Sequence, residues 1–180
     1  MSLITVLIVF FISYILLIKI MPFLTLDIPN SRSLHKKPVY RGGGLIFILI
    51  AFITIPFVKF YSLFLLTPLI IVGYLDDLFN LTPQIRYFIQ IFTVYLIMIF
   101  NLNITTDNII FYLVILISGT AIINFTNFID GIDGILVTNM IITFLHISIL
   151  NQSNNLYPLI GSLLAFFCLN KSPAKVFMGD

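Results

Sequence analysis

The sequence has few charged residues, no glutamate and a single cysteine. Only 9% of its 180 residues are charged, whereas an ordinary soluble domain carries roughly a quarter. Water is therefore not the main solvent for this chain. The one cysteine, Cys168, lies in an apolar run, which excludes an internal disulfide and a cysteine-based metal site. We interpret it as a small buried or lipid-facing residue.

The chain also lacks the marks of a nucleic-acid-binding or secreted protein. Its net charge is only +2, and no basic cluster is interleaved with aromatic residues, so no nucleic-acid partner is expected. The first apolar segment, Leu3–Met21, has no basic residues before it and no small-residue cleavage site. It is also longer than the apolar core of a signal peptide. We interpret this segment as a retained membrane span.

Apolar runs occupy most of the chain. Hydrophobic residues make up 60% of it, with a mean hydropathy of +1.15, and about 20 apolar residues in a helix cross a bilayer. The sequence therefore predicts an all-α integral membrane protein, a single polytopic domain over residues 1–180 with about seven transmembrane helices. The runs are Leu3–Met21, Leu45–Phe57, Tyr61–Leu75, Tyr87–Leu102, Ile109–Ile123, Ile135–Leu150 and Leu156–Leu169.

Alternation of the spans places four polar loops on one side of the membrane: Pro22–Gly44, Asp76–Arg86, Asn124–Gly134 and Lys171–Asp180. All Lys and Arg residues except Lys59 lie on that side, so the positive-inside rule makes it cytoplasmic and the N-terminus extracytoplasmic. All aspartates except Asp107 share the same side. Carboxylates contribute little to topology, so their clustering indicates a function.

One candidate site is the pair Asp76–Asp77 at the cytoplasmic end of the third span, followed by Arg86. Adjacent carboxylates repel, and holding both ionised near a low-dielectric boundary requires a cation. The pair therefore indicates a divalent metal or a general base. A polar helix end in water is the structural alternative.

A second candidate is the segment NFTNFIDGIDG, in which polar residues recur at every third position. In a helical turn they would line one face, where two amides and two carboxylates can bind a metal, a sugar or a base edge. A helix-capping loop explains one such residue but hardly all of them. The residues are Asn124, Asn127, Asp130 and Asp133.

A third candidate is the loop DIPNSRSLHKKPVYRGGG. Its basic residues precede three glycines that can present backbone N–H groups to an anion such as phosphate, although topology alone also favours Lys and Arg there. The last stretch, KSPAKVFMGD, signals little by itself. Basic residues, glycines and carboxylates on one face suit a phosphorylated substrate bridged by Mg²⁺, hence a phosphate-transfer reaction. The basic loop residues, with one histidine, are Arg32, His35, Lys36, Lys37 and Arg41.

In order and spacing, the segments DIPNSRSLHKKPVYRGGG, GYLDDLFNLTP, NFTNFIDGIDGIL and KVFMGD resemble the glycosyl transferase 4 family. These are the polyprenyl-phosphate N-acetylhexosamine-1-phosphate transferases, relatives of phospho-N-acetylmuramoyl-pentapeptide transferases. The PNSRSLH and RGGG variants look most like the branch that initiates O-antigen and related surface polysaccharides. The resemblance implies transfer of N-acetylhexosamine 1-phosphate from a UDP-sugar to undecaprenyl phosphate, with release of UMP, at the cytoplasmic face of a bacterial inner membrane.

The resemblance also implies roles for individual residues. Asp76 and Asp77 would be the catalytic pair, one of them deprotonating or orienting the lipid phosphate, and Asp180 would bind Mg²⁺. Both a direct attack by the lipid phosphate and a first phosphorylation of an aspartate remain open. Phe177 would offer its ring face to uracil. The residues expected at the nucleotide-sugar pocket are Asn127, Asp130, Asp133, Phe177, Lys36, Lys37 and Arg41.

Two further hypotheses stand beside the enzyme. Family members typically have more spans and continue beyond the last motif, so residues 1–180 resemble an incomplete family domain. We therefore also expect either an inactive fragment or one half of a split enzyme that pairs with a separately encoded C-terminal half; a homodimer is a further expectation. A small transporter is disfavoured, because apart from His146 the ionisable residues cluster at one membrane face.

Overall fold

The computed structural model describes residues 3–29, 35–58, 61–101 and 108–179. They form two compact units, each with its own internal contacts. Unit 1 comprises Met1–Phe60 and Ile129–Gly179, and unit 2 comprises Tyr61–Phe128. The predicted Mg²⁺ ligand, Asp180, and the basic residue Arg32 lie outside the described residues.

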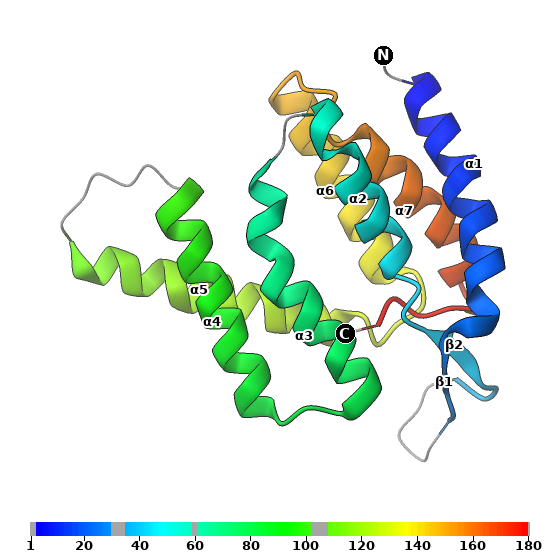
Figure 1. Ribbon diagram of the computed structural model, residues 1–180, viewed down its shortest axis with the longest axis horizontal. Coiled ribbons are helices and arrows are strands. Elements are labelled where there is room, and N and C mark those ends of the chain that lie inside the picture. Colours follow the sequence, from blue (N-terminus) through cyan, green and yellow to red (C-terminus); the bar gives the residue numbers. More distant parts are fainter. Residues whose placement is uncertain (1–2, 30–34, 59–60, 102–107, 180) are drawn as a thin grey trace. The chain divides into compact units, whose positions relative to one another are not determined.

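Unit 1 is built around helix α7 (Tyr157–Asn170), which packs against α1 (Leu3–Ile20), α2 (Leu45–Val58) and α6 (Ile135–Leu150) (Figure 1). Burial of apolar side chains from all four helices forms the core. At Gly161 the backbones of α7 and α1 approach so closely that a Cβ atom would lie 2.6 Å from the carbonyl oxygen of Val6. Core residues include Leu17, Ile46, Val137, Leu163 and Phe166.

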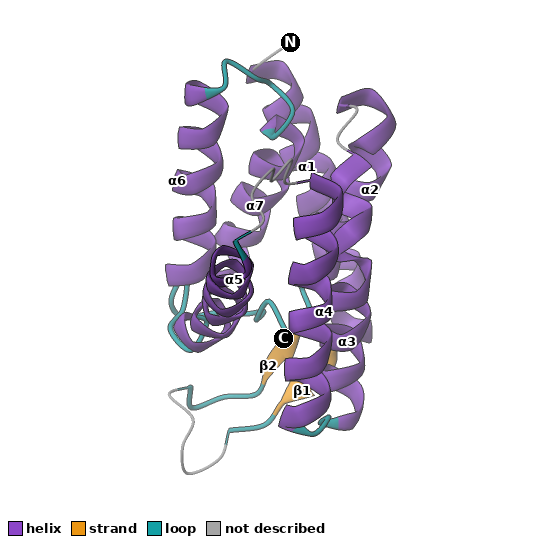
Figure 2. Ribbon diagram, turned by 90° about the vertical axis from the view of Figure 1, so that its left-hand side faces the viewer, coloured by secondary structure: helices purple, strands orange, loops and turns teal. Residues whose placement is uncertain are grey.

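A short hairpin follows α1 in unit 1. After the 3₁₀ turn η1 (Met21–Phe23), strand β1 (Thr25–Asp27) pairs antiparallel with β2 (Val39–Arg41) (Figure 2). The register sets Asp27 opposite Val39. This small sheet is absent from the all-α prediction, because three-residue strands leave no readable alternation in the sequence.

Unit 2 contains the 3₁₀ segment η2 (Tyr61–Leu66), helices α3 (Thr67–Phe79) and α4 (Pro83–Asn101), and all but the last residue of α5 (Ile109–Ile129). The α3 helix ends at Asn80, whose φ of 49° is left-handed, a conformation typical of helix ends. The next helix begins at Pro83, since proline tolerates the first helical position. At Gly119, α5 comes close to α4: a Cβ atom would lie 2.8 Å from a methyl carbon of Val94.

The described helices confirm an all-α integral membrane protein. By length and composition, four helical segments could cross a membrane, and three shorter helices are also apolar. The total number of spans and the extracytoplasmic N-terminus stay predictions. The long segments are Leu3–Phe23, Ser62–Phe79, Pro83–Phe100 and Ile109–Ile129; the shorter ones are Leu45–Thr54, Ile135–Leu150 and Tyr157–Asn170.

Candidate functional site

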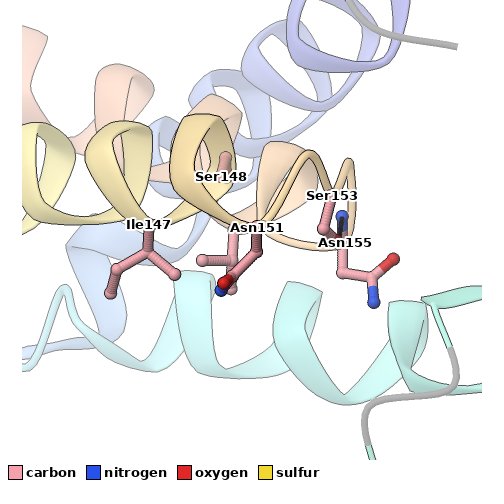
Figure 3. Close-up of a pocket in the computed structure, with 6 residues that line it drawn as sticks. Ile147, Ser148, Asn151, Ser153 and Asn155 are labelled. Atoms are coloured by element: carbon pink, nitrogen blue, oxygen red, sulfur yellow. Dashed lines mark hydrogen bonds between the residues drawn. The ribbon is translucent and has the colours of Figure 1, made fainter.

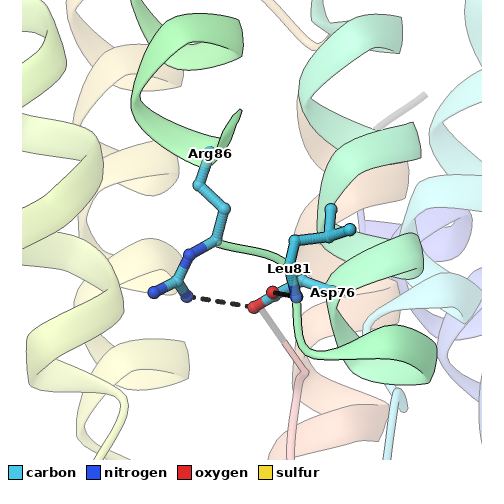
Figure 4. Close-up of polar contacts among 3 residues, drawn as sticks. All are labelled: Asp76, Leu81 and Arg86. Carbon is cyan, nitrogen blue, oxygen red and sulfur yellow. Dashed lines mark hydrogen bonds and ion pairs between the residues drawn. The ribbon is translucent and has the colours of Figure 1, made fainter. Parts of the chain in front are cut away.

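The first predicted carboxylate, Asp76, is fixed at the end of α3. Its side chain is buried, with one carboxylate oxygen accepting a hydrogen bond from the backbone N–H of Leu81 at 2.7 Å. The other accepts a hydrogen bond from Nη1 of Arg86 at 3.0 Å (Figure 4). These charge-assisted contacts join α3 to the first turn of α4. Arg86 therefore offsets the charge of Asp76. From the sequence, this role was predicted for a bound cation.

Asp77 differs from Asp76 in its surroundings. Successive residues on an α-helix are rotated by about 100°, so the two side chains leave α3 in different directions. The Asp77 side chain is half-buried, whereas Asp76 is buried. Of the predicted catalytic pair, Asp77 is thus the more accessible carboxylate.

The polar residues of NFTNFIDGIDG do not share one helical face, so that expectation is wrong. Helix α5 ends at Ile129, and Asp130 and Asp133 lie in the turn that follows. In unit 2, the side-chain N–H₂ of Asn124 donates to Oε1 of buried Gln90 at 2.7 Å and to the carbonyl of Thr120 at 2.9 Å. Asn124 thus joins α5 to α4. Asn127 is exposed on α5.

In unit 1, the turn after α5 is joined to the C-terminal tail, residues 171–179. One carboxylate oxygen of Asp133 accepts a hydrogen bond from the backbone N–H of Ala174 at 3.1 Å. The side chain of Asn170, only 3% exposed, accepts from the N–H of Gly134 at 3.0 Å and donates to the carbonyl of Val176 at 2.9 Å. Asp130 lies half-buried in the same turn.

Asn170 is a residue that sequence reasoning missed. A polar amide at the end of the apolar run before KSPAKVFMGD was the available signal, since a buried amide needs partners. It links two motif segments that are far apart in sequence.

The tail also pairs with the glycine segment after β2. The N–H of Phe177 donates to the carbonyl of Tyr40 at 2.7 Å, and those of Gly43 and Gly44 donate to the carbonyls of Phe177 and Met178 at 2.9 and 2.8 Å. The expectation that the glycines present their N–H groups to an anion is therefore wrong for Gly43 and Gly44. Their lack of a side chain serves packing: a Cβ on Gly43 would lie 2.7 Å from side-chain carbons of Phe166 and Val176.

We call the hydrogen-bonded β1–β2 region, the turn after α5 and the tail the frame. Several basic side chains belong to its segments or lie just before them. Lys36 and Lys37 are exposed just before β2, and Arg41 is half-buried within it. Lys175 is exposed in the tail, where its carbonyl accepts from the N–H of Tyr40 at 3.4 Å. The basic residues and half-buried Phe177 thus lie on two backbone segments that are hydrogen-bonded to each other.

A metal site requires donor side chains that lie close together. No group of three or more His, Cys, Asp or Glu side chains able to hold a metal occurs within the described ranges. Mg²⁺ at phosphate-transfer sites usually binds one or two carboxylates and completes its shell with substrate oxygens and water. The aspartates of the motif segments supply oxygen ligands of the type that Mg²⁺ requires.

A small pocket lies elsewhere in unit 1, at the α6–α7 turn (Figure 3). None of the predicted site residues lines it, and α6 separates it by about 24 Å, at 1.5 Å per residue, from the Asp133 turn. It is therefore apart from the motif segments. Its lining residues are Ile147, Ser148, Asn151, Ser153, Asn155 and Leu156.

The sequence pattern of Glycosyl transferase family 4 matches residues 59–180, two thirds of the chain. The chain belongs to this family. The match contains the Asp76–Asp77 pair, the turn with Asp130 and Asp133, and the tail. Lys36, Lys37 and Arg41 precede it.

The chain is also similar to three proteins that are each named phospho-N-acetylmuramoyl-pentapeptide-transferase. The protein of Fervidobacterium nodosum is 28% identical over 194 residues, covering 94% of this chain and 62% of the relative. That of Streptococcus pyogenes is 27% identical, covering 83% and 56%. That of Streptococcus uberis is 38% identical over 78 residues, covering 39% and 23%. The chain thus spans up to 62% of the length of these relatives.

Proposed function

We propose that this family-4 transferase moves an N-acetylhexosamine 1-phosphate from a UDP-sugar to undecaprenyl phosphate and releases UMP, at the cytoplasmic face of a bacterial inner membrane. The observation that carries the proposal is the frame in unit 1. There, hydrogen bonds from Asn170, Asp133 and the glycine segment hold three motif segments together: the β1–β2 region, the IDGIDG turn and the tail. A nucleotide sugar has several chemically different parts. Because the frame connects segments that carry amide, carboxylate, basic and aromatic groups, these groups can contact different parts of one such molecule.

Asp77 is the residue that we assign to the lipid phosphate. It would accept a proton from the lipid phosphate, or orient that phosphate, so that a phosphate oxygen attacks the β-phosphorus of the UDP-sugar. Asp76, held by Arg86 and Leu81, would fix the helix end from which Asp77 projects. The attack forms a new phosphorus–oxygen bond to the lipid phosphate and breaks the pyrophosphate bond to UMP.

Most of the residues that we assign to the UDP-sugar lie in unit 1, whereas Asn127 belongs to unit 2. Phe177 would present its ring to uracil, since bases stack on aromatic side chains. Lys36, Lys37 and Arg41 would bind the pyrophosphate. Asn127, Asp130 and Asp133 would contact the polar groups of the nucleotide sugar.

Aspartate oxygens of the motif segments are suitable ligands for Mg²⁺. Asp180, together with the pyrophosphate oxygens, would hold the ion. When bound, the ion supplies charge neutralisation on the pyrophosphate and on departing UMP. The chain's own cations, Lys36, Lys37 and Arg41, add to that neutralisation.

Transfer of labelled sugar phosphate to undecaprenyl phosphate, in membranes that contain the chain, tests this proposal. UDP-N-acetylglucosamine and UDP-N-acetylmuramoyl-pentapeptide are compared as donors, each with Mg²⁺ and with EDTA. The PNSRSLH and RGGG motifs predict the first donor and a surface polysaccharide such as O-antigen, whereas the names of the relatives favour the second. Mg²⁺-dependent product from either donor supports the transferase, and no product from both contradicts activity of the chain alone.

Crosslinking of two differently tagged copies in the same membranes tests the predicted homodimer.

A further inference from the structure

The segment that leads from β1 to β2 brings His35 against Phe177. The two ring centroids are 5.2 Å apart and the rings are inclined by 71°, an edge-to-face arrangement. The side chain of His35 is only 16% exposed, although the residue lies in a polar loop. This burial, next to the aromatic residue of the tail motif, is not required by membrane topology.

The Nε2 atom of His35 is buried and has no hydrogen-bond partner among the described residues. Oδ2 of Asp27 lies 4.0 Å from this atom. That is about 1 Å longer than a hydrogen bond, so Asp27 is the described carboxylate placed to act on Nε2. Buried polar atoms are rarely left without a partner, and one that is so left calls for a functional explanation.

Two backbone hydrogen bonds fix the main chain of Phe177. Its N–H donates to Tyr40 and its carbonyl accepts from Gly43. These bonds fix the main chain, but the direction of the ring depends on χ1 and χ2. Among the aromatic contacts of the described residues, the one made by the Phe177 ring is with His35.

We propose that His35 is a positioning residue that sets the orientation of the Phe177 ring, and that Asp27 holds the imidazole in place through Nε2. The inference rests on the proposed function, in which that ring stacks on the base of a UDP-sugar. In this role His35 acts through the Phe177 ring and takes no part in the chemical step. Its effect is therefore on nucleotide affinity and not on the chemical step.

The test is the affinity of the purified full chain, in detergent with Mg²⁺, for UMP and separately for undecaprenyl phosphate, by calorimetric titration. An edge-to-face pair contributes about 0.5–1.5 kcal/mol, so His35→Ala weakens UMP binding about 2- to 12-fold and leaves undecaprenyl phosphate binding unchanged. His35→Phe keeps a ring beside Phe177 and recovers part of the affinity. Asp27→Asn, which keeps the shape of its side chain, weakens UMP binding less than His35→Ala.

His146→Ala is the matched control, because it removes the other histidine of the chain, exposed on α6. Equal UMP affinity of His35→Ala and the unmodified chain overturns the inference alone. An equal loss of affinity for both ligands also overturns it, because that result indicates a general structural role. If His35→Ala does not fold, the UMP affinities of His35→Phe and Asp27→Asn test the inference, and unchanged UMP affinity in Asp27→Asn together with no binding in His35→Phe contradicts it. Failure of the unmodified chain to bind UMP overturns the proposed function as well.

Discussion

The two units hold their polar groups by different means. In unit 1, the tail, the turn after α5 and the glycine segment are joined mainly through backbone groups, with Asn170 and Asp133 as side-chain bridges. In unit 2, the end of α3 is held by the ion pair of Asp76 with Arg86. Backbone frames depend on close fit and on buried partners, whereas an ion pair depends on charge and is weakened by water. Substitutions in unit 1 should therefore be the more damaging.

The largest effect is expected for Asn170→Ala. The change leaves the N–H of Gly134 and the carbonyl of Val176 without the amide that now pairs them, and each orphaned buried group costs about 1–3 kcal/mol. We expect a loss of about 3 kcal/mol in the free energy of unfolding in mixed micelles. Asn139→Ala, at an exposed position on α6, is the control. Equal stability of the two variants would show that the backbone frame does not need Asn170.

Gly43→Ala should follow. The added methyl group meets side-chain carbons of Phe166 and Val176 at 2.7 Å, and overpacking costs about 1–3 kcal/mol. A loss of about 2 kcal/mol is expected, together with faster proteolysis of the tail. Gly131→Ala, in an exposed turn, should change neither quantity. Unchanged proteolysis of the Gly43 variant would contradict the close fit between the glycine segment and the tail.

Arg86→Met should have a smaller effect. It removes one partner of Asp76, but Arg86 is 36% exposed, so water reduces the loss that a fully buried pair would show. We expect about 1 kcal/mol, with partial recovery in Arg86→Lys. Gln84→Ala, on the exposed side of the same helical turn, serves as the control. A loss larger than that of Asn170→Ala would reverse the comparison between the units.

The smallest effect is expected where α4 and α5 meet. A double-mutant cycle on Gln90 and Asn124, which are hydrogen-bonded at 2.7 Å, should give a coupling energy of about 0.6 kcal/mol, as for hydrogen bonds between membrane helices. Asn127→Ala, exposed on α5, should show no coupling to Gln90. A coupling above about 2 kcal/mol would mean that unit 2 is held as firmly as unit 1.

The sequence could predict the helices well, because long apolar runs report burial or lipid contact directly. Five predicted runs agree with α1, α2, α4, α6 and α7 to within about four residues. The run from Ile109 starts with α5, but the helix continues six residues beyond its predicted end, to Ile129, and the run from Tyr61 begins as the 3₁₀ segment η2. The hairpin β1–β2 was not predictable, since its pairing comes from contacts between distant segments and not from local alternation.

The candidate site was predicted in its residue types but not in its connections. Charge and spacing singled out Asp76, Asp77 and the IDGIDG turn, yet nothing in the sequence indicated that Arg86 would pair with Asp76. The glycines were assigned to an anion because N–H groups can bind one, whereas Gly43 and Gly44 donate to carbonyls of the tail. Hydrogen bonds between segments more than a hundred residues apart depend on tertiary packing, which composition and periodicity do not encode.

The proposed function requires the carboxylate of Asp77 for sugar-phosphate transfer. We would compare Asp77→Asn with Asp107→Asn in the transfer assay with Mg²⁺, because Asp107 is the aspartate predicted to lie on the opposite side of the membrane. Loss of a catalytic base usually costs about 10²–10⁴-fold, so Asp77→Asn should lose transfer by that factor while Asp107→Asn retains it. Full activity of Asp77→Asn, in membranes where the unmodified chain is active, would contradict the claim.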